Sequence, residues 1–431
     1  MYRTHEDLQE RAHDQDTQIQ ALLARFDEMK HAKKVQEWTR AQELHVSGDR
    51  RAYHEEYTPK STRNRLTANN MMLSEHAVIA YYPRSPAQSY LNPPDIIKYC
   101  LLRPEDITEY FDKVNSFSSI LDEELHTPEK LIWTSPFLLP CICAIASRFY
   151  DTRPEVYMLA QEFAKDAAGK ALVSGQKSIE ACQAFLLLAV YPVPKKKWAE
   201  DRSWILMGVA IRMAIELELD QPPPLDCNER QALNRTRTWL NCYCVDGSHA
   251  IQFGKMPMLR LDDYLARTSR DWYKSSHMNI AYDVHLCAYV QIIVIMAKWR
   301  SLLAEGESNP KGFDVVAAAM ATSEDLAREL SLWVARYDEE LSMRPLLSCA
   351  YRGYTTRMIT YYMRLVVLAT GFQHAYKSGI SRKSEVLSKS IEVAKTVIQI
   401  MAEHLYPMGR LQYGMEANFL NVSFAAAYLV N

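Results

Sequence analysis

The stretch Ser203–Leu219, SWILMGVAIRMAIELEL, decides the fold, because its apolar residues recur with the spacing of an α-helix. It is followed by the proline-rich loop Gln221–Pro224, where a helix cannot continue, and then by a second helical pattern. Helix-like segments and short breakers alternate in the same way on both sides of this stretch. We therefore predict helices over residues 105–116, 134–149, 153–173, 177–190, 199–219, 229–253, 279–304, 312–340, 347–377, 383–404 and 414–430.

The composition agrees with an all-α protein. The 431 residues include only 13 Gly and 19 Pro, whereas doubly wound sheets and phosphate-binding loops need glycines at turns and helix starts. No pair of strand-like runs is joined by an Asn-Gly or Asp-Gly turn. Lys plus Arg is 50 and Asp plus Glu is 52, so the chain is not a basic protein that coats nucleic acid.

The first thirty residues carry a heptad pattern. Apolar residues alternate at spacings of four and three, interrupted once by a glutamine, at Leu8, Ala12, Gln15, Ile19, Leu22, Phe26 and Met29. This seam predicts a dimeric coiled coil over residues 1–30, and the alternative is one amphipathic helix that docks on its own domain. Residues 31–94 are polar and predict a flexible linker, and residues 95–431 form the helical domain. Because the last helix ends without a cap, we expect the chain to stop inside this domain.

The cysteines are spaced as buried thiols of a reducing compartment. There are nine, most of them in apolar runs. Cys141 and Cys143 are two residues apart, as are Cys242 and Cys244, so the members of each pair point to different sides of a helix and cannot share a metal ion. The polar N-terminus is not a signal peptide, and no run approaches about 18 uninterrupted apolar residues, so we expect an intracellular protein that is not in a membrane.

Motifs for several enzyme classes are absent from the sequence. There is no Gly-x-Gly-x-x-Gly or Gly-x-x-x-x-Gly-Lys nucleotide loop, no Gly-x-Ser-x-Gly elbow and no His-Glu-x-x-His zinc helix. The Asp262-Asp263 pair lacks a third acid one turn later, so it does not form the converging carboxylates that a magnesium site needs. We therefore predict that the chain is not an enzyme.

A specific resemblance begins in the first stretch and continues through the next helix. Gly208 and Arg212 lie in the helix 199–219, and NRTRTWL at 234–240 is followed by Tyr243, Asp246 and the turn Gly254–Pro257. This series resembles the middle homology region of fungal zinc-cluster transcription factors, best over residues 95–300. The motif residues are Gly208, Arg212, Arg235, Arg237, Trp239, Tyr243, Asp246, Gly254 and Pro257. Two positions depart from the family, which usually has Gly in place of Glu218 and Arg in place of Gly247.

We expect structural roles for these residues. A guanidinium beside apolar helices needs a carboxylate or a helix C-terminus, and Asp246 is the expected partner of Arg237. Trp239 and Tyr243 are four residues apart and should pack together as one aromatic wedge. Gly254 should end its helix.

The resemblance implies a function. It implies a nuclear regulator of RNA polymerase II transcription that is homodimeric, binds coregulators and responds to a small-molecule effector of the aromatic amino-acid or weak-acid type. In this family a six-cysteine cluster holds two zinc ions near the N-terminus, whereas the first cysteine here is Cys100. We therefore expect no cofactor in this chain, and DNA binding only through a zinc cluster that it lacks. The alternatives are a helical scaffold subunit, such as a kinetochore component, and an all-α enzyme that acts on apolar substrates.

Overall fold

The structure is a computed structural model that describes residues 94, 96–97, 102–150, 153–193, 200–308, 313–343, 347–377 and 384–430. All of them belong to the compact unit Met72–Asn431. The predicted coiled coil and most of the predicted linker lie outside the described residues. Within these ranges the regular structure consists of helices without a β-strand, which confirms the all-α prediction.

The long helices follow the sequence prediction to within about one turn. The α-helices are α5 (Pro104–Tyr110), α6 (Ser116–Ser118), α7 (Pro128–Thr134), α8 (Leu138–Ala146), α9 (Glu155–Val173), α10 (Ile179–Val190), α11 (Ser203–Glu216), α12 (Glu229–Gln252), α13 (Tyr264–Thr268), α14 (Asp283–Ser308), α15 (Val315–Met343), α16 (Leu347–Lys377), α17 (Glu385–Gln399) and α18 (Glu416–Val430). Among the described residues, the π-helical segments Phe111–Asn115 and Ile400–Leu405 extend α5 and α17. In the same ranges, 3₁₀ segments cover Ser147–Phe149, Ser269–Lys274 and Leu411–Tyr413. Helices α7 and α13 were not predicted, because so few residues give no readable period.

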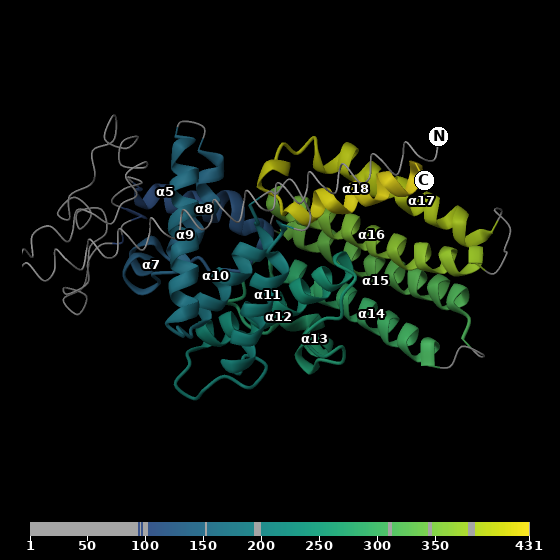
Figure 1. The fold of residues 1–431 in the computed structure, drawn as a ribbon, viewed down its shortest axis with the longest axis horizontal. Coiled ribbons are helices and arrows are strands. Elements are labelled where there is room, and N and C mark those ends of the chain that lie inside the picture. Colours follow the sequence, from purple (N-terminus) through teal and green to yellow (C-terminus); the bar gives the residue numbers. More distant parts are fainter. Residues whose placement is uncertain are drawn as a thin grey trace, which may run out of the picture. The chain divides into compact units, whose positions relative to one another are not determined.

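The long C-terminal helices lie side by side (Figure 1). Helix α16 packs against α15, α17 and α18, and α14 packs against both α12 and α15. One continuous core of buried apolar side chains reaches from Ile96 to Ala425. A smaller cluster surrounds Trp333 and Tyr337 where α14 faces α15. Helix α12 therefore sits where the N-terminal helices meet the long bundle.

Helix α14 is apolar for most of its length. By length and composition, residues Asp283–Gly306 could cross a membrane, but 61% of the apolar window is buried inside the protein. Burial of this extent favours the core helix of a bundle over a lipid-facing helix.

Seven of the eight described cysteines are buried, which confirms the predicted burial at those positions. The exception is the half-buried Cys227. Burial raises the pKa of the Cys141 and Cys244 thiols well above the ordinary value, so both remain protonated at neutral pH.

Helix α12 begins and ends with strong capping signals. The Asn228 side chain accepts a hydrogen bond from the Gln231 N–H, and the Gln231 side chain accepts one from the Asn228 N–H. At the other end Gly254 adopts φ +62°, and the Lys255 N–H donates to the Ala250 carbonyl over 2.8 Å. The prediction that Gly254 ends this helix is confirmed.

The departure at Glu218 lies in a strained backbone position. Glu218 follows α11 with φ +52°, a left-handed conformation that glycine adopts without a steric penalty. We expect Glu218→Gly to raise the free energy of unfolding by about 0.5–1 kcal/mol, measured by urea denaturation. Glu218→Ala is the matched control, because it removes the carboxylate and retains Cβ. If Glu218→Gly and Glu218→Ala had equal stability, the gain would not come from relief of backbone strain at this position.

Candidate functional site on helix α12

One face of α12 fastens the loop 255–263. Trp239 Nε1 donates to Asp263 Oδ1 over 3.3 Å, and the Tyr243 hydroxyl donates to the Leu261 carbonyl over 3.4 Å. Both rings are buried, at 3% and 4% exposure. Asp263 also accepts a hydrogen bond from the Ala266 N–H and so caps α13. The two aromatic residues therefore hold the loop and the helix after it.

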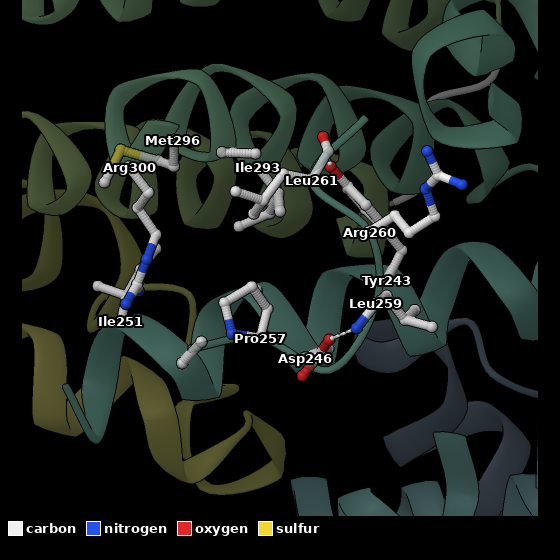
Figure 2. Close-up of a pocket in the computed structure, with 13 residues that line it drawn as sticks. Tyr243, Asp246, Ile251, Pro257, Leu259, Arg260, Leu261, Ile293, Met296 and Arg300 are labelled. Carbon is white, nitrogen blue, oxygen red and sulfur yellow. Dashed lines mark hydrogen bonds between the residues drawn. The ribbon is translucent and has the colours of Figure 1, made fainter. Parts of the chain in front are cut away.

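Asp246 makes the third of these attachments. Its Oδ2 accepts a hydrogen bond from the Leu259 N–H over 2.7 Å, as Figure 2 shows. The side chain is buried, and its Oδ1 has no hydrogen-bond partner among the described residues. Burial raises the pKa of this carboxyl, while backbone hydrogen bonds from Leu259 and Met258 and the charge of Arg300 oppose the rise. Asp246 is thus an anchor for the loop backbone.

A pocket opens between α12, this loop and α14 (Figure 2). Its lining is mainly apolar and includes Ile251, Pro257, Ile293, Met296, Ala297 and Arg300. The volume of the cavity is about 20 Å³. This is room for one water or the tip of one side chain, and a drug-sized effector needs a larger cavity.

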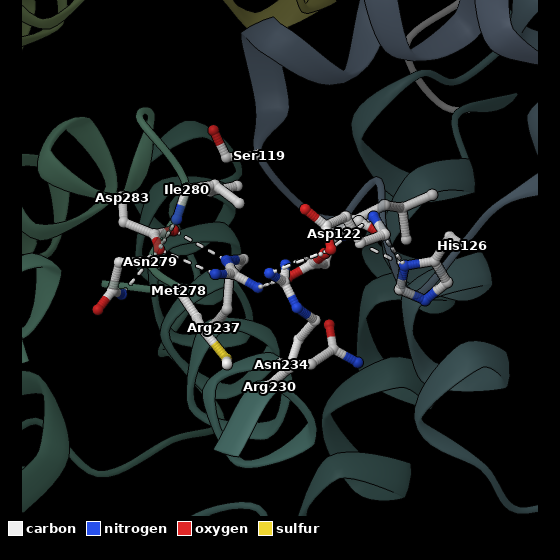
Figure 3. Close-up of polar contacts among 12 residues, drawn as sticks. Ser119, Asp122, His126, Arg230, Asn234, Arg237, Met278, Asn279, Ile280 and Asp283 are labelled. Carbon is white, nitrogen blue, oxygen red and sulfur yellow. Dashed lines mark hydrogen bonds and ion pairs between the residues drawn. The ribbon is translucent and has the colours of Figure 1, made fainter. Parts of the chain in front are cut away.

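The opposite face of α12 carries a buried ion pair (Figure 3). Arg237 is fully buried and pairs bidentately with Asp283, with Nε–Oδ1 of 2.8 Å and Nη2–Oδ2 of 2.9 Å. Its Nη1 lies 3.5 Å from Asp122 Oδ2. Burial alone would lower the pKa of Arg237, but hydrogen bonding to Asp283 and the nearby carboxylates outweigh burial and raise it. The guanidinium is therefore a permanent charge that joins three segments of the fold.

Asp122 extends this network towards the N-terminal helices. It is fully buried and accepts from Arg230 Nη1 at 3.0 Å and 3.2 Å. Next to it, Gln183 Nε2 donates to the Asn234 and Thr238 side chains and to the Ile120 carbonyl. Charges and amides thus connect α10, α12 and the segment before α7. Gln183 Oε1 is buried without a hydrogen-bond partner among the described residues.

The predicted pairing of Arg237 with Asp246 is wrong. Nine residues at about 100° each rotate by about 900°, which places the two side chains on opposite faces of α12. The true partners, Asp283 and Asp122, come from distant segments, and sequence spacing held no signal for them.

The remaining motif residues have simpler roles. Arg235 Nη2 donates to the Leu217 and Glu218 carbonyls, both at 2.9 Å, which confirms the predicted contact with a helix C-terminus. Arg212 is exposed on α11 and therefore needs no buried partner. Gly208 lies against Met258, since a Cβ there would be 3.5 Å from the Met258 sulfur. Pro257 lines the pocket.

The donor set of the described residues does not fit a metal centre. No group of three His, Cys, Asp or Glu side chains in those ranges converges on a point that could hold an ion. Cys182 and Cys242 have sulfurs 4.0 Å apart in the core, but they bring no further ligand with them. The zinc chemistry that the resemblance implies therefore finds no ligands in this part of the chain.

Comparison with known families agrees with the geometry of α12. Residues 107–269, which include both faces of α12 and the fastened loop, match the fungal specific transcription factor domain. The match confirms, for this part of the chain, the resemblance that the motif residues predicted.

Two curated proteins are similar to the chain. It is 25% identical to Protein priB of Lentinula edodes over 363 residues, which cover 81% of this chain and 58% of that protein. It is 22% identical to Transcriptional regulatory protein SEF1 of Candida albicans over 186 residues, 40% of this chain and 19% of that protein. The chain therefore spans less than two thirds of the length of either relative. No solved structure matches it significantly.

Proposed function

We propose that the chain is the regulatory and dimerisation region of a fungal zinc-cluster transcription factor that controls RNA polymerase II transcription in the nucleus. The observation that carries the proposal is the match of residues 107–269 to the fungal specific transcription factor domain. One face of α12 holds the loop 255–263 at the surface, and this supports a role by contact with other proteins. Homodimerisation through the seam from Leu8 to Met29 is part of the proposal.

An effector would act on this domain by shifting its helices. The pocket beside α12 has room for one water-sized group, so an aromatic amino acid or weak acid would need the helices around it to separate. Such a ligand would select a more open state of the domain.

A reporter experiment tests the regulatory role. The full chain is fused to an unrelated DNA-binding module in yeast, and transcription of a reporter with the matching operator is measured. We expect reporter expression to differ from that with the module alone. Arg237→Met should abolish the difference because it destabilises the domain. Arg212→Met, at an exposed position, is the control and should behave as the parent fusion. Expression equal to that of the module alone, with the fusion protein present on immunoblots, would defeat the proposal.

A further inference from the structure

The loop after α12 exposes apolar side chains that the fold does not use. Met256 is 65% exposed and Met258 is 37% exposed, on either side of Pro257. Ile205, on the neighbouring α11, is 59% exposed and lies one turn before Gly208, which faces Met258. Methionine adapts its shape to different partners and is frequent on binding surfaces. We call Ile205, Met256, Met258 and the pocket beside them the methionine surface.

Basic side chains border the methionine surface. Lys255 and Arg260 are exposed on the loop, and the half-buried Arg300 donates to the Lys255 carbonyl at the mouth of the pocket. Arg260 shares its charge with Asp262, at 3.1 Å. The carboxylate of the pocket, Asp246, is buried and engaged by the loop backbone. Lys255 and Arg300 therefore bring positive charge to this surface, and positive charge favours carboxylates.

The loop is also held in place before any partner arrives. Trp239, Tyr243 and Asp246 fasten it at Asp263, Leu261 and Leu259. A surface that is already ordered loses little entropy on binding, so modest apolar contacts suffice for affinity. The small pocket suits one apolar side-chain tip, which would lie between Ile251 and Met296.

We infer that the methionine surface binds an acidic amphipathic peptide segment of a partner protein, with an apolar side chain in the pocket and carboxylates on Lys255, Arg260 and Arg300. The segment would lie as a helix whose apolar residues recur at positions i, i+3, i+4 and i+7. This inference names the partner class for the proposed regulatory role, but it concerns binding by the purified chain and is tested without any transcription assay.

The test measures binding of a synthetic peptide to the full chain by fluorescence anisotropy. The probe has about sixteen residues, which is about four helical turns, with Leu and Phe at the amphipathic positions and Asp or Glu elsewhere. We expect it to bind more weakly as salt rises, and we expect a peptide with Lys in place of each acid not to bind. Met256→Asp and Arg300→Glu should each weaken binding roughly tenfold.

Two matched variants test whether the loss of peptide binding is specific to the methionine surface or follows from any new acidic residue on the protein surface. Met158 on α9 is 68% exposed, close to the 65% of Met256, and Lys170 is an exposed basic residue on the same helix. Met158→Asp and Lys170→Glu should leave binding unchanged, and thermal melting should show all four variants folded. No binding of the acidic peptide, equal binding of the lysine peptide, or equal effects of Met158→Asp and Met256→Asp would each overturn the inference. So would a fall in oligomer mass for Met256→Asp with peptide binding unchanged, since the surface would then join two copies of the chain.

Discussion

Arg237→Met is expected to lower the free energy of unfolding by about 3–5 kcal/mol, the cost of breaking a buried ion pair on one side. The Arg237 guanidinium is fully buried and neutralises Asp283 through two hydrogen bonds. Asp122 would keep Arg230, at 3.0 Å, but Asp283 would keep only the Asn279 side chain and the Ile280 N–H. Methionine fills much of the arginine volume, so the loss would report the uncompensated charge and not a cavity. Urea denaturation followed by circular dichroism measures it.

Two further variants make this result specific. Arg212→Met changes another arginine of the family motif, at an exposed position, and should alter stability by less than about 0.5 kcal/mol. Arg237→Met combined with Asp283→Asn removes the orphaned charge, so the double variant should be more stable than Arg237→Met alone. If Arg237→Met and Arg212→Met unfold at the same urea concentration, the ion pair contributes nothing to the fold.

The helices could be predicted from the sequence because each long segment carries several turns of apolar periodicity. Helix α16 begins and ends at the residues that the pattern indicated, Leu347 and Lys377. Helix α13 has only five residues, and its start depends on the Asp263 cap, which is defined by the side chains of α12. Short elements of this kind follow from tertiary contacts and leave no period in the sequence.

The site could be predicted only in part. The motif singled out Trp239, Tyr243 and Asp246, and their spacing of four and three residues places them on one face of a helix. What that face contacts could not be derived, because the loop that it fastens has no regular pattern. The same limit applies to Arg237: the helix period excludes Asp246 as a partner, but no local signal identifies Asp283, 46 residues away. Partners across a core are set by packing of whole helices.

The two departures from the family motif have different physical origins. At Glu218 this chain places a side chain in a conformation that suits glycine. At Gly247 it has lost a side chain, and the reason is the close approach of α14. A Cβ on Gly247 would clash with Ile293 Cγ2, so that a neighbour would have to move. The usual arginine of the family therefore cannot stand here while α14 keeps its present position.

Gly247→Arg is accordingly expected to destabilise the protein by about 3 kcal/mol, the upper part of the range for overpacking a core. Ile293 is 3% exposed and belongs to the main core, so it has little freedom to yield. Gly247→Ala carries the same Cβ and gains about 1 kcal/mol of helix propensity, so its net loss should be smaller. Thermal and urea unfolding of the three proteins, compared side by side, measure the series.

Gly169 and Ile293 supply the decisive comparisons. Gly169 lies inside α9, where an added Cβ would have no atom within 4 Å, so Gly169→Ala should stabilise by about 0.5–1 kcal/mol through helix propensity alone. Ile293→Leu removes Cγ2 at nearly constant volume and should cost less than about 1.5 kcal/mol by itself. In the Gly247→Ala background, Ile293→Leu should lower the free energy of unfolding by less than it does in the parent protein, or even raise it, because the clashing methyl group is gone. If the effects of Gly247→Ala and Ile293→Leu on the free energy of unfolding are additive, α12 and α14 do not meet at this point. The stability lost on substituting Gly247 would then need a cause outside the α12–α14 contact.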